Sequence, residues 1–465
     1  MSATKRRVRV SVAAVGATAL LAACGSGDSG GGEEGGPLTV WTLENLPDRL
    51  AAQEEIAAAF TESSGVEVEL VAVDPNQFNQ LLTSSAAAGE LPDVIGALPL
   101  AGVQLLATNE LVDSEVTASV VEGLGADTFS ERALELTRDG DTQLAVPSDG
   151  WAQLLVYRKD LFDAAGLAAP ETYEDILAAA QALDTPERAG FVGATVPNDA
   201  FTQQTFEHLA LGNGCQLVDD AGEVTLDSDA CVNSFAFYDQ LISDHSVAGA
   251  QDVDTTRAAY FAGQSAMVVW SSFILDEMAG LRADALPSCP ECAADPAFLA
   301  RNSGVVTAVA GPDGDEGAQF GEVVSWAITA GAQTDAAAQF VTYMMEDGYE
   351  QWIGFSPEGK VPTRRGTAEE PTRFIDAWAT LPAGVDTKAP LSDFYSPEVL
   401  DALRTAPDAI SPWGIPQGQG ALVGASLGEL PVPQAIAAMT GGEVDPGGAA
   451  QQATEALREI ASSLD

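Results

Sequence analysis

Short apolar strands alternate with amphipathic helices near the start of the chain, and this alternation restricts the fold most strongly. Residues 49–65 and 77–89 have apolar side chains at helical spacing and end at a glycine, which predicts two helices. Short apolar runs at 37–43, 66–73 and 92–98 surround them and predict strands. Because strands that alternate with helices form βαβ units, we expect a parallel sheet covered by helices.

The rest of the chain continues this mixture. We expect strands at 265–272 and 321–329. We expect helices at 171–183, 231–244, 334–347 and 449–462. A chain of 465 residues exceeds what one hydrophobic core usually organises, so two lobes are expected. Beyond the N-terminus, no segment has the run of about 20 apolar residues that spans a membrane.

The first 23 residues have the pattern of a secretory signal. Four basic residues precede an uncharged run at 10–23, which is shorter than the roughly 20 residues that cross a bilayer. The tetrapeptide LAAC, which ends at Cys24, resembles the bacterial lipobox, in which cleavage precedes the cysteine and its thiol is lipidated. The glycine-rich stretch at 24–36 would then be a flexible tether.

We therefore expect a signal peptide at 1–23 and a protein that is lipid-anchored at Cys24 on the extracytoplasmic face of the cell membrane. The alternative is an ordinary signal with an incidental Cys24.

The charge of the chain excludes several partners. It has 20 Lys+Arg against 69 Asp+Glu. Removal of residues 1–23 would take away four basic residues and no acidic ones, which leaves a formal net charge of −53. Such a chain lacks the cations that bind nucleic acid or anionic lipid. With 46% hydrophobic residues the chain is not a disordered acidic tail. Salt would screen the repulsion between its acidic side chains, which suggests a saline or alkaline habitat.

Four further cysteines are candidates for disulfide bonds. Cys215 and Cys231 flank a segment that is typical of a hairpin running into a helix, and Cys289 and Cys292 form a C-x-x-C motif. In an exported protein this predicts the disulfides 215–231 and 289–292. A structural zinc ion held by all four thiolates is the alternative.

No set of residues forms a recognisable catalytic motif. The string GFSPEGKV at 354–361 approaches a P-loop, but Val361 stands where that loop needs Ser or Thr, and no helix is expected to follow. The chain has two histidines and neither H-E-x-x-H nor G-x-S-x-G; His208, in a helical context, is expected to be structural with its hydrogen bonds satisfied. We expect no enzyme, no cofactor and no metal.

An ordered series of motifs resembles one protein family. The string VPSDGWAQLLVYRKDLFDAAGLAAPETYEDILAAAQAL at 146–183 is similar to the most recognisable block of the family 1 extracellular solute-binding proteins, the family of the maltose-binding protein. In that family a strand ending in Tyr-x-Lys-Asp-Leu-Phe precedes a short helix, Ala-Gly-Leu, a proline and another helix. Similar blocks stand in the family's order at 92–113, 258–278, 305–314, 325–345 and 359–365.

The resemblance implies the fold and the mode of action. It implies an α/β, two-lobed periplasmic-binding-protein-like fold (type II), in which each lobe is a sheet flanked by helices and the ligand cleft lies at the hinge. Lobe one would comprise 37–146 with 305–352, and lobe two 147–304 with 353–465. The lobes would close on a ligand and a membrane permease would recognise the closed form.

The same resemblance implies the partners. The expected function is that of a monomeric substrate-binding lipoprotein of an ABC importer for a sugar or oligosaccharide. Alternatives are the same fold with a polyamine or peptide ligand, or an anchored glycan hydrolase.

Sugars need aromatic faces against their C–H surfaces and planar polar groups for their hydroxyls. On the family pattern, the predicted ligand-binding residues are Trp41, Glu44, Asn45, Asp149, Trp151, Phe201, Gln203, Gln204, Trp270 and Trp413. Either Arg364 or Arg365 is expected at the cleft rim, and Trp326 and Trp352 are expected to pack in the core. The loop at 96–102 has no polar side chain, which departs from many sugar binders of the family.

Overall fold

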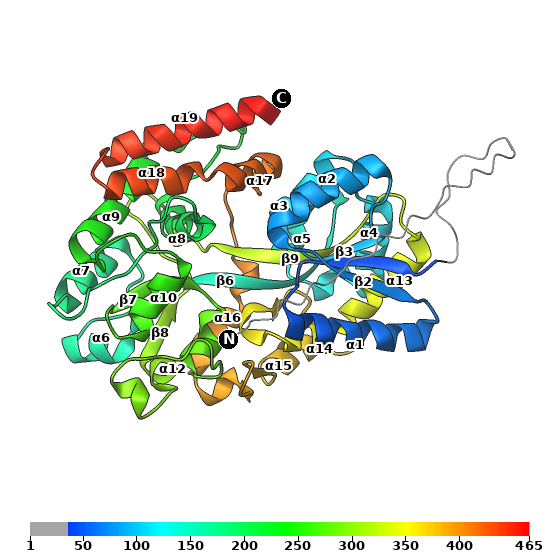
Figure 1. Ribbon diagram of the computed structural model, residues 1–465, viewed down its shortest axis with the longest axis horizontal. Coiled ribbons are helices and arrows are strands. Elements are labelled where there is room, and N and C mark those ends of the chain that lie inside the picture. Colours follow the sequence, from blue (N-terminus) through cyan, green and yellow to red (C-terminus); the bar gives the residue numbers. More distant parts are fainter. Residues whose placement is uncertain (1–35, 465) are drawn as a thin grey trace, which may run out of the picture.

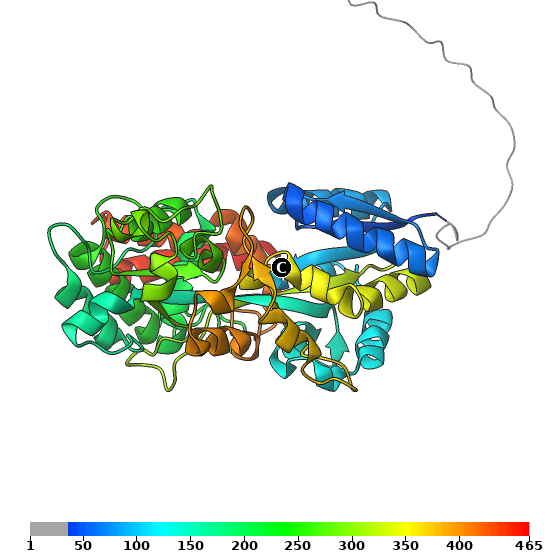
Figure 2. The same ribbon diagram turned by 90° about the horizontal axis from the view of Figure 1, so that it is seen from below.

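The computed structural model describes residues 36–464. The predicted signal peptide, Cys24 and the tether up to residue 35 lie outside the described residues. Helices gather in two groups, a first lobe and a second lobe, on either side of the long strands β6 (Val146–Arg158) and β9 (Gly321–Ile328) (Figure 1). Figure 2 shows the same division from below.

One continuous sheet runs through both lobes. Its path is β10-β6-β9-β3-β1-β2, and β7 and β8 pair with the far half of β6. The remaining strands of this sheet are β1 (Leu38–Thr42), β2 (Val68–Ala72), β3 (Val94–Pro99), β7 (Met267–Ser271), β8 (Ser303–Val306) and β10 (Val361–Pro362). Because β6 is 13 residues long, its first half pairs with β9 and β10 and its second half belongs to the second lobe.

The expected parallel sheet is only part of this architecture. β1 pairs in parallel with β2 and β3, as the βαβ pattern predicts. All pairs that involve β6 or β9 are antiparallel. The reason is topological, since the chain returns between the lobes instead of continuing through crossover helices.

Seven helices flank the first-lobe strands: α1 (Pro47–Ser64), α2 (Phe78–Ala88), α3 (Leu100–Thr108), α4 (Ser114–Leu124), α5 (Glu131–Leu136), α13 (Thr334–Met345) and α14 (Tyr349–Gly354). α1 begins at a proline and ends at Gly65, whose φ of 79° suits glycine. Its Phe60 packs edge-on against Phe340 of α13, with ring centroids 5.2 Å apart. This aromatic pair joins two helices that lie far apart in sequence.

The second lobe is mostly helical. Its helices are α6 (Lys159–Ala165), α7 (Tyr173–Leu183), α8 (Ala200–Ala210), α9 (Asp229–His245), α10 (Val253–Phe261), α11 (Ile274–Met278), α12 (Phe298–Asn302), α17 (Gly420–Glu429), α18 (Pro431–Thr440) and α19 (Pro446–Leu464). The short helices α15 (Arg373–Trp378) and α16 (Pro397–Arg404) lie near β10. Two small hairpins, β4 (Arg138–Asp139) with β5 (Thr142–Gln143) and β11 (Pro382–Ala383) with β12 (Ala389–Pro390), complete the structure.

All strands and helices that the sequence predicts are present, with ends shifted by a few residues. The expected hairpin between the first two cysteines is reduced to a single bridge between Val218 and Val224. Within residues 36–464, no single helix is long and apolar enough to cross a membrane. Only α17 and α18 taken together, which are bent relative to each other, reach the necessary length and apolar composition.

The two lobes touch through α3 and α17. At Gly420, the first residue of α17, this contact leaves no room for a side chain. A Cβ atom at this position would lie 2.2 Å from the Cβ of Gln104 in α3. Glycine therefore permits the two helices to approach.

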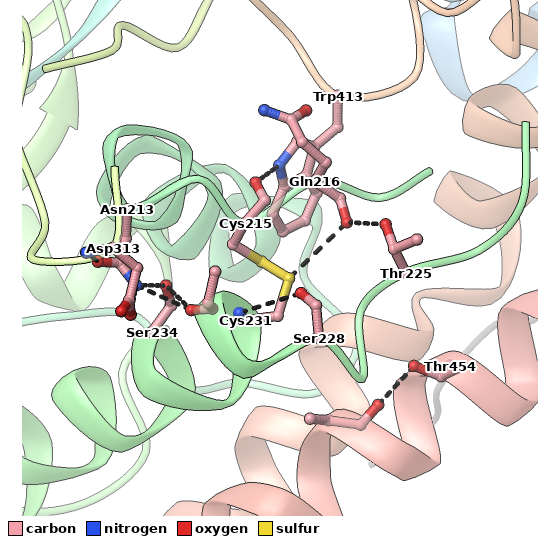
Figure 3. Close-up of a disulfide and its surroundings, with 12 residues drawn as sticks. Asn213, Cys215, Gln216, Thr225, Ser228, Cys231, Ser234, Asp313, Trp413 and Thr454 are labelled. Carbon is pink, nitrogen blue, oxygen red and sulfur yellow. Dashed lines mark hydrogen bonds between the residues drawn. A yellow bond between two sulfur atoms is a disulfide. The ribbon is translucent and has the colours of Figure 1, made fainter. Parts of the chain in front are cut away.

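Both predicted disulfides are present. The Cys215–Cys231 bond ties the segment after α8 to the start of α9 (Figure 3). Because the four sulfur atoms are bonded in pairs, the alternative of a four-cysteine zinc site is wrong for this structure. The indole Nε1 of Trp413 donates to the carbonyl of Cys215 at 2.8 Å, so this disulfide also supports a tryptophan from the C-terminal region.

His208 is structural, as expected, but its hydrogen bonding differs from the prediction. Its side chain is fully buried in α8, and neither ring nitrogen has a hydrogen-bond partner among the described residues. Burial lowers the pKa of His208 to about 3, because a charged imidazole would lose its hydration.

We expect the two disulfides to contribute unequally to stability. In the chain-entropy model, a loop of about 16 residues is worth roughly 3 kcal/mol and a loop of four residues about 2 kcal/mol. The double variant Cys215→Ala/Cys231→Ala should therefore unfold at lower urea than Cys289→Ala/Cys292→Ala. Equal losses in the free energy of unfolding would contradict this ranking.

We also expect His208 to make the protein less stable in acid. Its pKa is about 3 in the folded state and about 6.5 when unfolded, so between these values only the unfolded chain binds the proton. The stability contribution falls as the pH drops through this window, by up to about 1.4 kcal/mol per pH unit. Urea unfolding at pH 7.5 and 5 should show a smaller loss for His208→Gln than for the wild type; the same loss in both would refute the assignment.

Candidate ligand site between the lobes

A buried ammonium group joins three chain segments where the lobes meet. Lys360, beside β10, has a side chain that is 2% exposed. Its Nζ lies 2.6 Å from Oε1 of Glu44 in the loop after β1, and 3.3 Å from Oδ2 of Asp149 in β6. The indole of Trp352 donates to Oδ1 of Asp149 at 2.5 Å. We call Glu44, Asp149 and Lys360 the hinge triad.

The two carboxyl groups of the hinge triad differ in their titration. Burial opposes ionisation of Glu44, but Lys360 and Arg49 outweigh it and lower the pKa of Glu44 to about 2. Burial raises the pKa of Asp149, against the opposing effects of Lys360, Ser148 and Trp352. Glu44 is therefore the ionised counter-ion of Lys360, and Asp149 contributes hydrogen bonds with Lys360 and Trp352.

Aromatic rings enclose the same ammonium group. Lys360 Nζ lies 4.3 Å from the centroid of the Trp352 ring and 5.2 Å from that of Phe355, within the range of cation–π attraction. The neighbouring Gly359 has no room for a side chain, since a Cβ there would lie 1.9 Å from the Phe273 ring. The string that resembles a P-loop thus forms a packed junction.

Several cavities receive residues from both lobes, and two of them are lined by buried acidic side chains. The first, which we call the tryptophan cavity, has a volume of about 60 Å³. It is lined by Leu100 and Ala101 from the first lobe, by Phe320 and Glu322 on and beside β9, and by second-lobe residues that include Gln203, Gln204, Glu207 and Trp413. Gln203, Gln204 and Glu207 share one face of α8 because they lie within one helical turn of each other.

Two carboxyl groups of the tryptophan cavity have pKa values above the ordinary value of a glutamate side chain. Burial raises the pKa of Glu207 to about 8, although its Oε1 accepts a hydrogen bond from the backbone N–H of Trp413 at 2.7 Å. Burial also raises the pKa of Glu322 to about 7, and its Oε1 accepts from the N–H of Leu100 at 3.0 Å. A neutral carboxyl group both donates and accepts, which suits a hydroxyl-bearing ligand.

Gln203 offers an unused acceptor in the same cavity. Its side chain is 4% exposed, and its Oε1 has no hydrogen-bond partner among residues 36–464. A buried amide oxygen without a partner costs about 1–3 kcal/mol. A ligand hydroxyl would remove this cost.

The second cavity, which we call the acidic cavity, has a volume of about 140 Å³. Its lining comes from the loop and first turn of α1, from α11 and the segment after it, and from the segment between α14 and β10. The lining residues are Leu46, Asp48, Arg49, Asp276, Arg282, Phe355, Ser356, Glu358, Gly384 and Val385.

Six of the predicted ligand-binding residues lie at the lobe junction. Gln203, Gln204 and Trp413 line the tryptophan cavity. Trp151 packs edge-on against Phe320 of that cavity, with ring centroids 5.9 Å apart. The other two, Glu44 and Asp149, belong to the hinge triad.

The four others lie elsewhere. Trp41 is in the first-lobe core, and Asn45 is exposed in the loop after β1. Phe201 and Trp270 pack together with centroids 5.8 Å apart, and the Trp270 indole donates to the carbonyl of Val253. None of these four is in the lining of the two cavities.

The arginine expected at the cleft rim is placed differently. Arg364 is 1% exposed and donates to the carbonyls of Met345 and Leu124, so the prediction is wrong for this residue. Arg365 pairs with Asp408 at the surface. Trp326 and Trp352 are buried packing residues, as predicted.

Sequence reasoning missed several residues of the junction. These are Lys360, Glu207, Glu322, Phe320, Asp276 and Glu358. The acids were hidden among 69 Asp+Glu. Lys360 could have been found from the sequence, because it is one of only three lysines after residue 23. A rare cation in an acidic chain marks a position where a positive charge is needed.

Comparison with known proteins agrees with this architecture. The family model described as bacterial extracellular solute-binding protein matches residues 44–351. One relative is the putative ABC transporter periplasmic-binding protein YcjN of Escherichia coli (strain K12). It is 27% identical over 334 residues, which cover 70% of this chain and 72% of the relative.

Solved structures have the same fold. The GacH receptor of Streptomyces glaucescens aligns with a TM-score of 0.66 and 21% identity, over 91% of this chain and 98% of the receptor. Maltose-bound MalE3 of T. maritima aligns with a TM-score of 0.66 and 18% identity, over 91% of this chain and 99% of MalE3. The predicted two-lobed periplasmic-binding-protein fold is therefore confirmed.

The family is one of binding proteins, which agrees with the expectation that the chain is not an enzyme. Because the family model covers most of the chain, from the loop after β1 to α14, the protein belongs to the bacterial extracellular solute-binding proteins.

Proposed function

We propose that this protein is the substrate-binding lipoprotein of an ABC importer, which captures a sugar or oligosaccharide between its lobes and delivers it to a membrane permease. The observation that carries the proposal is the tryptophan cavity. Residues of both lobes line it, and it combines aromatic surface with amide and carboxyl groups. This is the combination that a sugar needs, since its C–H faces are apolar and its hydroxyls both donate and accept.

The position of the cavity supports a closing mechanism. A ligand that contacts both lobes binds the closed arrangement more tightly than the open one, and it shifts the equilibrium toward closure. The strands β6 and β9 and the segment at β10 connect the lobes, so we propose that they form the hinge. We propose the lobe boundaries given above, 37–146 with 305–352 and 147–304 with 353–465, and a monomeric receptor.

Similar proteins support the ligand class. The GacH receptor was solved with acarbose, and MalE3 with maltose. A sugar transporter of Arthrobacter chlorophenolicus A6, with 18% identity and a TM-score of 0.64, was solved with laminaribiose. An arabinooligosaccharide-binding protein of Halalkalibacterium halodurans is 28% identical over 36% of this chain.

Calorimetric titration with a panel of disaccharides and oligosaccharides tests the proposal. A dissociation constant near 1 μM, about −8 kcal/mol, is expected for the right ligand, together with compaction of the protein in X-ray scattering. Binding of no sugar in the panel, or binding without compaction, would contradict the proposed function.

We expect Gln203→Ala to weaken sugar binding by about tenfold or more. The variant removes an acceptor that has no partner inside the protein, and a hydrogen bond of this kind is worth about 1–3 kcal/mol. Titration of the same sugar into wild type and variant measures the effect. Gln451→Ala, on the exposed face of α19, is the matched control and should bind as the wild type does; equal affinity of all three proteins would exclude Gln203 from the site.

We also propose that Cys24 carries the lipid that holds the receptor at the membrane. Cells expressing the full chain should incorporate labelled palmitate into the protein and retain it in the membrane fraction. Cys24→Ser should lose the label and release the protein from that fraction, while sugar affinity stays unchanged. Retention of the label in Cys24→Ser would show that the anchor lies elsewhere.

A further inference from the structure

The acidic cavity contains two buried carboxyl groups with unused oxygens. Asp276 and Glu358 are 2% and 3% exposed. Oδ1 of Asp276 and Oε2 of Glu358 have no hydrogen-bond partner among the described residues. Both residues line the cavity, which lies between α1 of the first lobe and α11 of the second lobe.

The two cations in the cavity lining are already paired with other carboxylates. Arg49 contacts Glu44 at 2.7 Å and donates to Ser356 at 2.9 Å. Arg282 contacts Asp284 at 3.0 Å. Among the described residues, neither guanidinium donates a hydrogen bond to Asp276 or Glu358, although Arg282 lies near enough to act electrostatically on both acids.

The remaining contacts of the pair leave one oxygen of each acid without a hydrogen-bond partner among the described residues. Ser356 donates to Oε1 of Glu358 at 2.5 Å, which leaves Oε2. The neighbouring Glu277 points to Arg257, at 2.8 Å, and does not line the cavity. Burial, together with the nearby Glu358 carboxyl, raises the pKa of Asp276 to about 8, although Arg282 opposes the rise.

We infer that the acidic cavity is a subsite for a primary ammonium group of the ligand, held between Asp276 and Glu358. The inference rests on the proposed function, because it takes the sugar captured between the lobes to carry an amine that reaches this second interlobe cavity. An ammonium group has three donors and one positive charge. It matches two unpaired carboxylate oxygens, whereas a guanidinium would duplicate the arginines already present.

The location couples the subsite to closure. The cavity exists only where α1, α11 and the segment before β10 meet, so a group bound there contacts both lobes. Charge-assisted hydrogen bonds are about twice as strong as neutral ones. A ligand with an amine should therefore close the lobes at lower concentration than the same ligand with a hydroxyl.

The test compares two disaccharides that differ only in the amino groups that replace one hydroxyl on each ring. The β-1,4-linked disaccharide of glucosamine and its neutral counterpart cellobiose are titrated into the purified protein at pH 7, and spermidine serves as an amine without a sugar. We expect the glucosamine disaccharide to bind at least tenfold more tightly than cellobiose. In Asp276→Asn and in Glu358→Gln this ratio should fall toward one while cellobiose affinity is retained.

Glu54→Gln is the matched control, since it removes one acidic charge from the exposed face of α1. It should keep the wild-type ratio. Thermal unfolding of each variant establishes that it is folded. Because two carboxyl variants are tested independently, the experiment remains decisive even if one of them fails to fold.

The outcomes separate this inference from the proposed function. Equal affinity for the two disaccharides, or an unchanged ratio in both carboxyl variants, overturns the ammonium subsite and leaves sugar binding intact. Binding of spermidine alone, lost in Asp276→Asn, supports the subsite and rejects a sugar as the ligand. Binding of none of the three probes overturns the inference.

Discussion

The arrangement of the lobes depends on one buried positive charge. A lysine that is removed from water is tolerated only with a counter-ion, and Lys360 finds Glu44 in the first lobe and Asp149 on the strand that crosses to the second. Removal of one partner from such a buried pair typically costs 3–5 kcal/mol. The hinge triad therefore fixes three segments that are distant in sequence, and residues that follow Glu44 and precede Lys360 line the acidic cavity.

The cavities combine contributions that no single element of the fold supplies. α8 provides Gln203 and Glu207, the disulfide-supported loop provides Trp413, and β9 provides Glu322. Because Leu100 and Ala101 of the first lobe line the same cavity as these groups, movement of the lobes would change the distances across the cavity. Recognition by closure, as proposed above, would link the affinity for the ligand to the conformation of the two lobes.

Local sequence patterns predicted the fold well and the site only partly. Helices and strands follow from periodicity within about ten residues, and the signal of a two-lobed family follows from the order of motifs. Whether a tryptophan faces the core or a cavity depends instead on distant partners. Trp270 donates to Val253, and Trp413 donates to Cys215, yet only the latter lines a described cavity, and nothing local in the sequence distinguishes the two.

The glycine at the start of α17 makes the contact between the lobes sensitive to the size of the residue at this position. At Gly420 the two lobes are separated by less than the width of a methyl group, since a Cβ there would collide with Gln104. A larger residue at this position would force α17 away from α3 and so hold the lobes further apart. The distance between the two lobes is thus set in part by a position that has no side chain at all.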